Sequence, residues 1–237
     1  MNLTIMSLTA RAMLGRKRVL MLLPMPVILI GLTLLGVTSG ESEAAWGPVV
    51  FSSLGISVIL PLTALIIGSS ALGLEIDDGT ITHLLTKPLP RSEIVLSKLA
   101  VAWLVTTVAT GIPLAAAALI AGSGTLAVGL VIGAAIGGLA YTALFLALSV
   151  MTKRPVAVGL VYIVLWENIL VSFVSGARIF SVRQHATAIA DSIGNTQLMD
   201  ASVSVTTALV MSVIFIVVGT IGATQRLRSF ALTGEAN

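Results

Sequence analysis

The chain has 237 residues, of which 57% are hydrophobic and only 10% are charged, and its mean hydropathy is +1.08. A soluble domain carries about 25% charged residues, so this composition excludes an ordinary soluble domain and indicates a membrane protein. The chain has no cysteine, which excludes disulfides and thiolate metal sites. It also has no GxxxxGK[ST] loop, so any nucleotide that drives this protein must bind to another chain.

Several apolar stretches approach the roughly 20 residues that a helix needs to cross a bilayer. They lie near 19–38, 49–74, 99–121, 126–151, 156–175 and 203–222. Together they take up more than half of the chain. The sequence therefore predicts an all-α polytopic membrane protein with six spans, formed by a single transmembrane domain over residues 1–237.

Basic residues are distributed unevenly between the two sides of the predicted spans. Of the 13 Lys and Arg residues, Arg178 and Arg183 fall on one side, and the other 11 fall on the opposite side. This asymmetry predicts a multi-pass protein of the plasma membrane with both termini in the cytoplasm. Topology therefore explains the basic excess, and we expect no nucleic-acid partner, because phosphate binding needs a clustered basic face.

Two segments outside the spans have amphipathic patterns. In residues 2–15, apolar side chains such as Met6 and Ala10 share one helical face, which predicts a helix on membrane lipid at the cytoplasmic interface. A frayed basic N-terminus is the alternative. A second pattern within residues 176–202 predicts an external interfacial helix or part of a re-entrant turn, ending in a turn at 194–195.

Glycines recur at four-residue spacing in the predicted fourth span, at Gly129, Gly133 and Gly137. This spacing places them on one helix face and lets a neighbouring backbone approach closely. It predicts a helix-packing interface, either within one protomer or between two. The alternative is that glycine is simply frequent in membrane helices.

Glu167 is an acidic residue deep in an apolar run, with Asn168 beside it. An intramembrane carboxylate is costly and indicates a functional site by default. It could cap or hydrogen-bond a broken helix near the outer leaflet, line a substrate path, or carry a coupling proton. The neighbouring Asn168 favours a hydrogen-bonded break in the helix.

The two histidines, His83 and His185, fall on opposite sides of the predicted membrane. This placement excludes a shared metal site or a joint catalytic pair. We expect both side chains to be solvated or interfacial, and the sequence predicts neither a catalytic site nor a metal site.

The segment 74–98 places seven charged residues between two apolar stretches. Asp78, Gly79 and Thr80 predict a turn and the start of a helix. Prolines at 88 and 90 end that helix, and Ser92 is predicted to cap the helix that continues into the third span.

The short helix predicted at residues 80–86 has one apolar face, because Ile81, Leu84 and Leu85 fall at i, i+3 and i+4. A helix of roughly seven residues is not stable alone in water. Its apolar face must therefore be buried against the membrane or a partner, unless the segment is an ordinary membrane-surface loop.

This segment resembles the cytoplasmic segment of ABC-2 type transporter permeases. That family typically shows an acidic residue, a Gly-Thr pair, two leucines, a proline, an Arg-x-Glu group and a basic residue that opens the third span. The matching residues here are Glu75, Gly79, Thr80, Leu84, Leu85, Pro88, Arg91, Glu93 and Lys98. The six spans and the basic amphipathic N-terminus also agree with the family's architecture.

The resemblance implies an export permease that forms half of a membrane dimer, with a second copy or a homologous permease. A separate ABC ATP-binding subunit would dock on it and hold the ATP and Mg²⁺, so no cofactor is expected in this chain. Residues 80–86 would be the coupling helix. The docking and coupling residues would be Glu75, Gly79, Thr80, Ile81, His83, Leu84, Leu85, Pro88 and Arg91. The alternatives are a proton-coupled secondary transporter that uses Glu167 and a membrane assembly subunit that transports nothing.

Overall fold

The computed structural model describes the chain except for residues 1–5, 11–21, 78–89, 197, 200 and 235–237. Within the described residues all regular secondary structure is helical. The prediction of an all-α polytopic membrane protein is confirmed.

The chain forms long helices joined by short turns. Two of these segments, η1 and η2, are π-helices, whose backbone hydrogen bonds span five residues rather than four. The elements are α3 (Pro24–Thr38), α4 (Glu43–Gly47), η1 (Pro48–Ile59), α5 (Leu60–Asp77), α7 (Arg91–Ile120), α8 (Gly124–Met151), α9 (Pro155–Val161), η2 (Tyr162–Leu170), α10 (Val171–Phe173), η3 (Ser175–Phe180), α11 (Val182–Gly194) and α12 (Val205–Gly234).

The predicted spans two to six each correspond to a helix that is long and apolar enough to cross a membrane. These helices are Glu43–Gly73, Arg91–Ile120, Gly124–Met151, Pro155–Phe173 and Val205–Ser229. The predicted first span corresponds to α3, a shorter apolar helix of 15 residues. The first residues of that predicted span, up to 21, lie outside the described part of the chain.

The predicted cap of the third-span helix is wrong. Helix α7 begins at Arg91 with Pro90 as its N-cap residue, so Ser92 lies inside the first turn and does not cap it. The Pro90 carbonyl accepts the first helical hydrogen bond, from the Glu93 amide at 2.9 Å. The helix of the span predicted near 49–74 begins earlier, at α4, because this short helix continues directly into η1.

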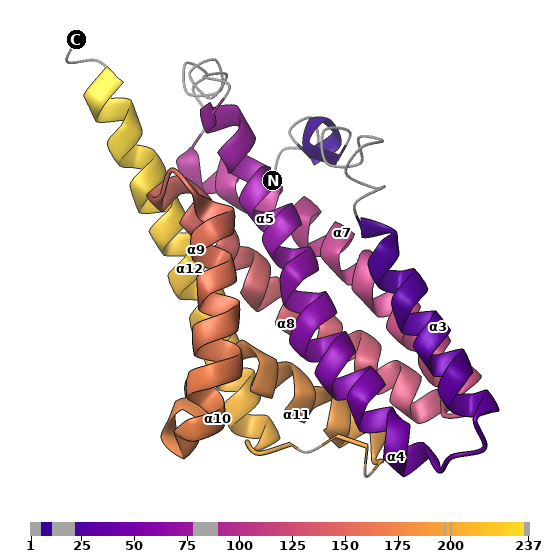
Figure 1. Ribbon diagram of the computed structural model, residues 1–237. Helices are drawn as coiled ribbons and strands as arrows, with labels where there is room; N and C mark the ends of the chain where they lie inside the picture. Colours follow the sequence, from indigo (N-terminus) through magenta and orange to yellow (C-terminus); the bar gives the residue numbers. More distant parts are fainter. Residues whose placement is uncertain (1–5, 11–21, 78–89, 197, 200, 235–237) are drawn as a thin grey trace.

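The helices run up and down through one bundle, and α11 lies across one end of it (Figure 1). We call this the α11 end; α4 and α10 also lie there. At the opposite end α5 stops at Asp77 and α7 starts at Arg91. The α8–α9 turn and the last turns of α12 lie at the same end, which we call the basic end after its described residues Arg91, Lys153, Arg154, Arg226 and Arg228.

Helix α8 occupies the centre of the bundle and packs against α5, α7, α11 and α12. In its most apolar stretch, 67% of the residues are buried, against 22% for Pro155–Phe173 and 17% for Val205–Ser229. The last two segments thus expose apolar faces outward, as expected for helices that contact lipid.

A cluster of buried side chains fills the basic end, which we call the basic-end core. Its larger members are Ile67, Leu72, Ile94, Val95, Leu99, Leu146, Val150 and Leu227. Residues 6–10, the described part of the predicted N-terminal helix, are helical, and Met6 and Ala10 pack against this core. These are two of the residues assigned to the apolar face of that helix.

Candidate functional site

The Glu167 carboxylate in η2 lies at a junction between two helices. It accepts hydrogen bonds from the Tyr162 hydroxyl at 3.0 Å, from the Val182 amide at 2.9 Å and from the Ser181 hydroxyl. The residue is only 1% exposed. A buried carboxylate is tolerated when hydrogen-bond donors surround it, and here three donors do so.

These donors place the negative charge at the start of α11. Ser181 is the N-cap residue of α11, and its hydroxyl oxygen also accepts from the Gln184 amide at 3.2 Å. A carboxylate at a helix N-terminus is stabilised by the helix dipole and by the free amides of the first turn. This geometry favours the interpretation that Glu167 caps a break between helices.

Asn168 stabilises the unusual backbone of η2 rather than extending the carboxylate site. Its side-chain amide donates to the Ile163 carbonyl, five residues earlier, at 2.8 Å. The Ser172 hydroxyl in turn donates to the Asn168 carbonyl at 2.6 Å. Polar side chains therefore bond to backbone carbonyls along this irregular stretch of a span.

An aromatic wall stands next to Glu167. Tyr141 and Phe145 of α8 stack with ring centroids 5.8 Å apart, and Tyr162 meets Phe145 edge-on at 6.3 Å. Both α8 residues are 0% exposed. The wall fixes the Tyr162 ring, so its hydroxyl is held in place to donate to the carboxylate.

Helix α11 covers the glycine face of α8. A β-carbon added at Gly133 would lie 2.7 Å from the Ala186 carbonyl oxygen and 2.9 Å from the Ala190 β-carbon. At Gly137 it would lie 2.6 Å from the Ala186 β-carbon, and at Gly129 it would strike the Ala190 carbonyl. The structure therefore places a helix of the same protomer against all three glycines, and they permit its close approach.

The prediction that His185 is solvated or interfacial is wrong, because the side chain is 0% exposed. It belongs to α11 and lies three residues after the buried Val182, on the face that packs into the bundle. Its Nε2 atom lies 2.9 Å from the Ile179 carbonyl oxygen. Burial lowers the pKa of His185, and the bond to that carbonyl only partly opposes this effect.

A second buried ionisable side chain, Lys98, lies near the basic end. It stands two turns into α7, is 1% exposed, and donates from Nζ to the Ala71 carbonyl oxygen of α5 at 2.8 Å. The bond crosses between the helices that enter and leave the segment 78–89. Lys98 therefore fastens α5 to α7 close to that segment.

Within the residues that the structure describes, no group of three His, Cys, Asp or Glu side chains is placed to hold a metal ion. The ionisable side chains described above are held by hydrogen bonds to other parts of the same chain. Their arrangement fits structural linkage between helices better than it fits a reaction centre.

The comparison with protein families matches residues 5–227 to the family described as ABC-2 family transporter protein. The chain belongs to the ABC-2 transporter family. It is thus a multi-pass membrane permease of an ABC transporter, a component that transports and is not itself catalytic, and the resemblance drawn from the 74–98 segment is confirmed. The comparison with curated proteins gave no match.

Two of the docking residues predicted for this ABC-2 permease, Glu75 and Arg91, are described and lie near the basic end. Glu75 belongs to the last turns of α5, and Arg91 is the first residue of α7 and is partly buried. The rest of the predicted docking set lies outside the described residues: Gly79, Thr80, Ile81, His83, Leu84, Leu85 and Pro88. The roles of all these residues stay predictions.

Sequence reasoning missed the structural roles of three residues, one of which, Lys98, it had named only as part of the family motif. Ser181 had a visible signal, since Ser181 and Gln184 match the S-x-x-Q capping pattern before an amphipathic run. Lys98 also had one, because it follows the first two turns of a helix whose neighbouring positions are apolar. Tyr162 had none, because its role depends on the π-helical winding of η2.

Proposed function

We propose that this permease exports its substrate and that a separate ATP-binding-cassette subunit drives it by docking on the segment 78–89. The observation that carries the proposal is the pairing of α5 and α7 at either end of that segment. Their facing residues pack in the basic-end core, and Lys98 bonds to Ala71 across them. A movement of the segment, driven by the ATPase partner, would therefore move the spans that contain α5 and α7 together.

The segment's own chemistry supports a docked partner. Its apolar triad at positions 81, 84 and 85 belongs to a helix too short to be stable alone. A groove on an ATPase subunit would bury that face, as other amphipathic helices are buried in apolar grooves. The family membership makes an ATP-binding-cassette subunit the expected owner of the groove.

The energy source follows from what the chain carries. No GxxxxGK[ST] loop occurs in its sequence, so the partner subunit would bind and hydrolyse ATP with Mg²⁺. A second copy of the permease, or a homologous one, would complete the pathway. The uneven distribution of basic residues supports a plasma-membrane protein with the basic end and both termini in the cytoplasm.

The test is a charge placed on the apolar face of the segment. The double substitution Leu84→Asp with Leu85→Asp should abolish stimulation of the partner's ATPase activity and also abolish transport. Thr82→Asp with Thr86→Asp adds the same charge on positions that helical spacing turns away from that face, so it serves as the matched control. Stimulation that survives the leucine substitutions but not the threonine ones would contradict the proposed docking face.

The same preparation separates the two alternatives. A proton-coupled transporter would move substrate without ATP and would lose that activity in Glu167→Gln. An assembly subunit would co-purify with its complex and give no substrate-dependent ATPase activity. Either result would replace the proposal of an ATP-driven exporter.

A further inference from the structure

A groove opens at the basic end beside the turn between α8 and α9. Its volume is about 640 Å³, which lies within the range of about 300–1,000 Å³ typical of small-molecule sites. Lys153 and Arg154 form its rim, and Ala157, Val158 and Val161 of α9 form its wall. The groove is thus larger than a single anion requires, and it has a polar part and an apolar part.

The rim carries two positive charges that the protein itself leaves uncompensated. Both side chains are exposed, and no acidic residue lines the groove. Among the described residues, neither the Lys153 ammonium nor the Arg154 guanidinium has a hydrogen-bond or ion-pair partner; the Arg154 backbone amide bonds to the Thr152 hydroxyl at 3.2 Å. The rim is therefore complementary to an anion.

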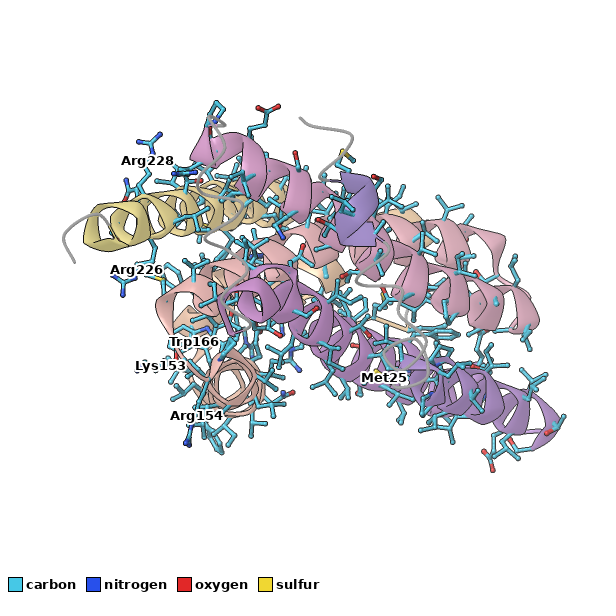
Figure 2. The ribbon with its side chains drawn as sticks, turned by 90° about the horizontal axis from the view of Figure 1, so that it is seen from above. Met25, Lys153, Arg154, Trp166, Arg226 and Arg228 are labelled. Carbon is cyan, nitrogen blue, oxygen red and sulfur yellow. The ribbon has the colours of Figure 1, made fainter. Side chains whose placement is uncertain are left out.

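The wall is placed to meet lipid. The α8–α9 turn joins two helices that cross the membrane, so the rim lies at the level of the headgroups. Along α9, Val158 is 42% exposed and Val161 is 55% exposed. Figure 2 shows Lys153 and Arg154 beside α9, which is seen nearly end-on, whereas Arg228 lies apart on α12.

Two other cavities show what sets this groove apart. Cavities of about 430 Å³ and 390 Å³ lie along α7, and no charged residue lines either of them. Their lining is almost entirely apolar, with one threonine in each, Thr63 and Thr107. The groove at the α8–α9 turn combines paired cations with an apolar wall that leads into the membrane, which matches the shape of an amphiphile.

We propose that this groove is a binding site for an anionic phospholipid. The phosphate bonds to the Arg154 guanidinium, whose donors fit phosphate oxygens in a bidentate manner, and the Lys153 ammonium adds a point charge. One acyl chain lies along Ala157, Val158 and Val161. Basic pockets between membrane helices are suited to such headgroups. The proposal uses no residue of the segment 78–89 and does not depend on the ATPase partner.

The first test measures lipid retention by the full-length permease. Native mass spectrometry in detergent compares added phosphatidylglycerol with phosphatidylcholine of the same acyl chains. The wild type should retain phosphatidylglycerol preferentially, and Lys153→Gln with Arg154→Gln should weaken that retention roughly thirtyfold, or roughly fivefold per residue. Arg178→Gln with Arg228→Gln removes the same charge elsewhere and should leave retention unchanged. Equal retention by both double variants would overturn the site.

The second test separates a lipid from a free anion. Ala157→Trp fills the apolar wall but keeps both cations, and it should lower phosphatidylglycerol retention about tenfold. Leu160→Trp, on the same helix outside the groove, is the matched control. Retention unaffected by Ala157→Trp, together with full displacement of the lipid by inorganic phosphate, would mean an anion site and would overturn the lipid proposal. Each variant counts as folded if it has the same oligomeric state as the wild type in native mass spectrometry and the same helical circular dichroism spectrum.

Discussion

Glu167 and Lys98 are both 1% exposed, and they hold together different parts of the permease. Glu167 receives its hydrogen bonds from residues 5, 14 and 15 positions away in the sequence, so it fixes one continuous piece of chain at the α11 end. Lys98 donates to a carbonyl 27 positions away and links two spans near the basic end. Glu167 thus completes a local fold, whereas Lys98 joins α5 and α7, the helices before and after the segment 78–89.

The difference follows from the hydrogen-bond partners of Glu167 and Lys98. The acceptor oxygens of Glu167 compensate the free donors at the start of α11, and those donors have few other partners in the bilayer. The Ala71 carbonyl belongs to the interior of α5, where helical backbone bonding already serves it. Removing Glu167 therefore leaves buried donors without acceptors, whereas removing Lys98 mainly loosens α5 from α7.

The largest expected effect comes from Glu167→Gln. Its amide group replaces an acceptor oxygen with a donor, which leaves at least one of the three buried donors unsatisfied. We expect a loss of about 2–4 kcal/mol in the free energy of unfolding, at about 1–3 kcal/mol per unsatisfied group with more for a charged partner. Thermal unfolding in detergent measures it. Glu43→Gln on exposed α4 is the control, and equal stability of the two variants would contradict the capping role.

Gly133→Ala tests whether α11 is held by packing as well as by Glu167. The added β-carbon meets the Ala186 carbonyl and Ala190, so α11 must shift, at a cost of about 1–3 kcal/mol. Gly222→Ala on α12 enters open space and should be neutral or slightly stabilising. Proteolysis of the α11 region and thermal unfolding compare the two. If they behave alike, contact between α11 and α8 contributes little.

Lys98→Met should distinguish the role of Lys98 from that of Glu167 most clearly. Methionine has a similar length and no charge to bury, so the free energy of unfolding should change by less than about 1.5 kcal/mol. The amount of substrate moved per ATP should nonetheless fall severalfold, because α5 and α7 no longer move together. Arg228→Met is the control for removing a cation. A large loss of stability with unchanged coupling would give Lys98 a role like that of Glu167.

The smallest effect is a pH dependence at the α11 end. Burial lowers the pKa of His185, so the folded protein binds a proton there less readily than the unfolded chain, whose histidine takes one up below about pH 6.5. Stability is therefore fully present above about pH 6.5 and decreases as the pH falls below it. Unfolding temperatures at about pH 7.5 and about pH 5 should differ less in His185→Gln than in the wild type. His83→Gln should leave the difference intact; if it removes the difference instead, the titrating group lies in the segment 78–89.

The features that depend on the length of an apolar run could be predicted well from the sequence. Each helix assigned to spans two to six overlaps the apolar stretch that predicted it, because backbone groups in lipid must bond within their own helix. The cost of burying a carboxylate also marked Glu167 as a special position. Each of these features depends only on one stretch of the chain and on the bilayer around it.

What the sequence did not predict depends on partners distant along the chain. The spacing of Gly129, Gly133 and Gly137 indicated a close contact but could not name α11 as the helix that makes it. The family motif named Lys98 as the basic residue that opens the third span, but it could not name the Ala71 carbonyl of α5 as its partner. His185 was expected to be solvated or interfacial, although its spacing from Val182 put it on the apolar face of α11, where it is buried.

The turns at the α11 end have a consequence for anything that approaches the permease from that side. Residues 39–42 join α3 to α4 and residues 121–123 join α7 to α8, with Gly40 and Gly122 at positive φ in these tight reversals. Such reversals leave almost no chain above the helix ends (Figure 1). An antibody or a receptor at this face would therefore meet chiefly helix ends, the residues around η3 and α11, and the connection between α11 and α12.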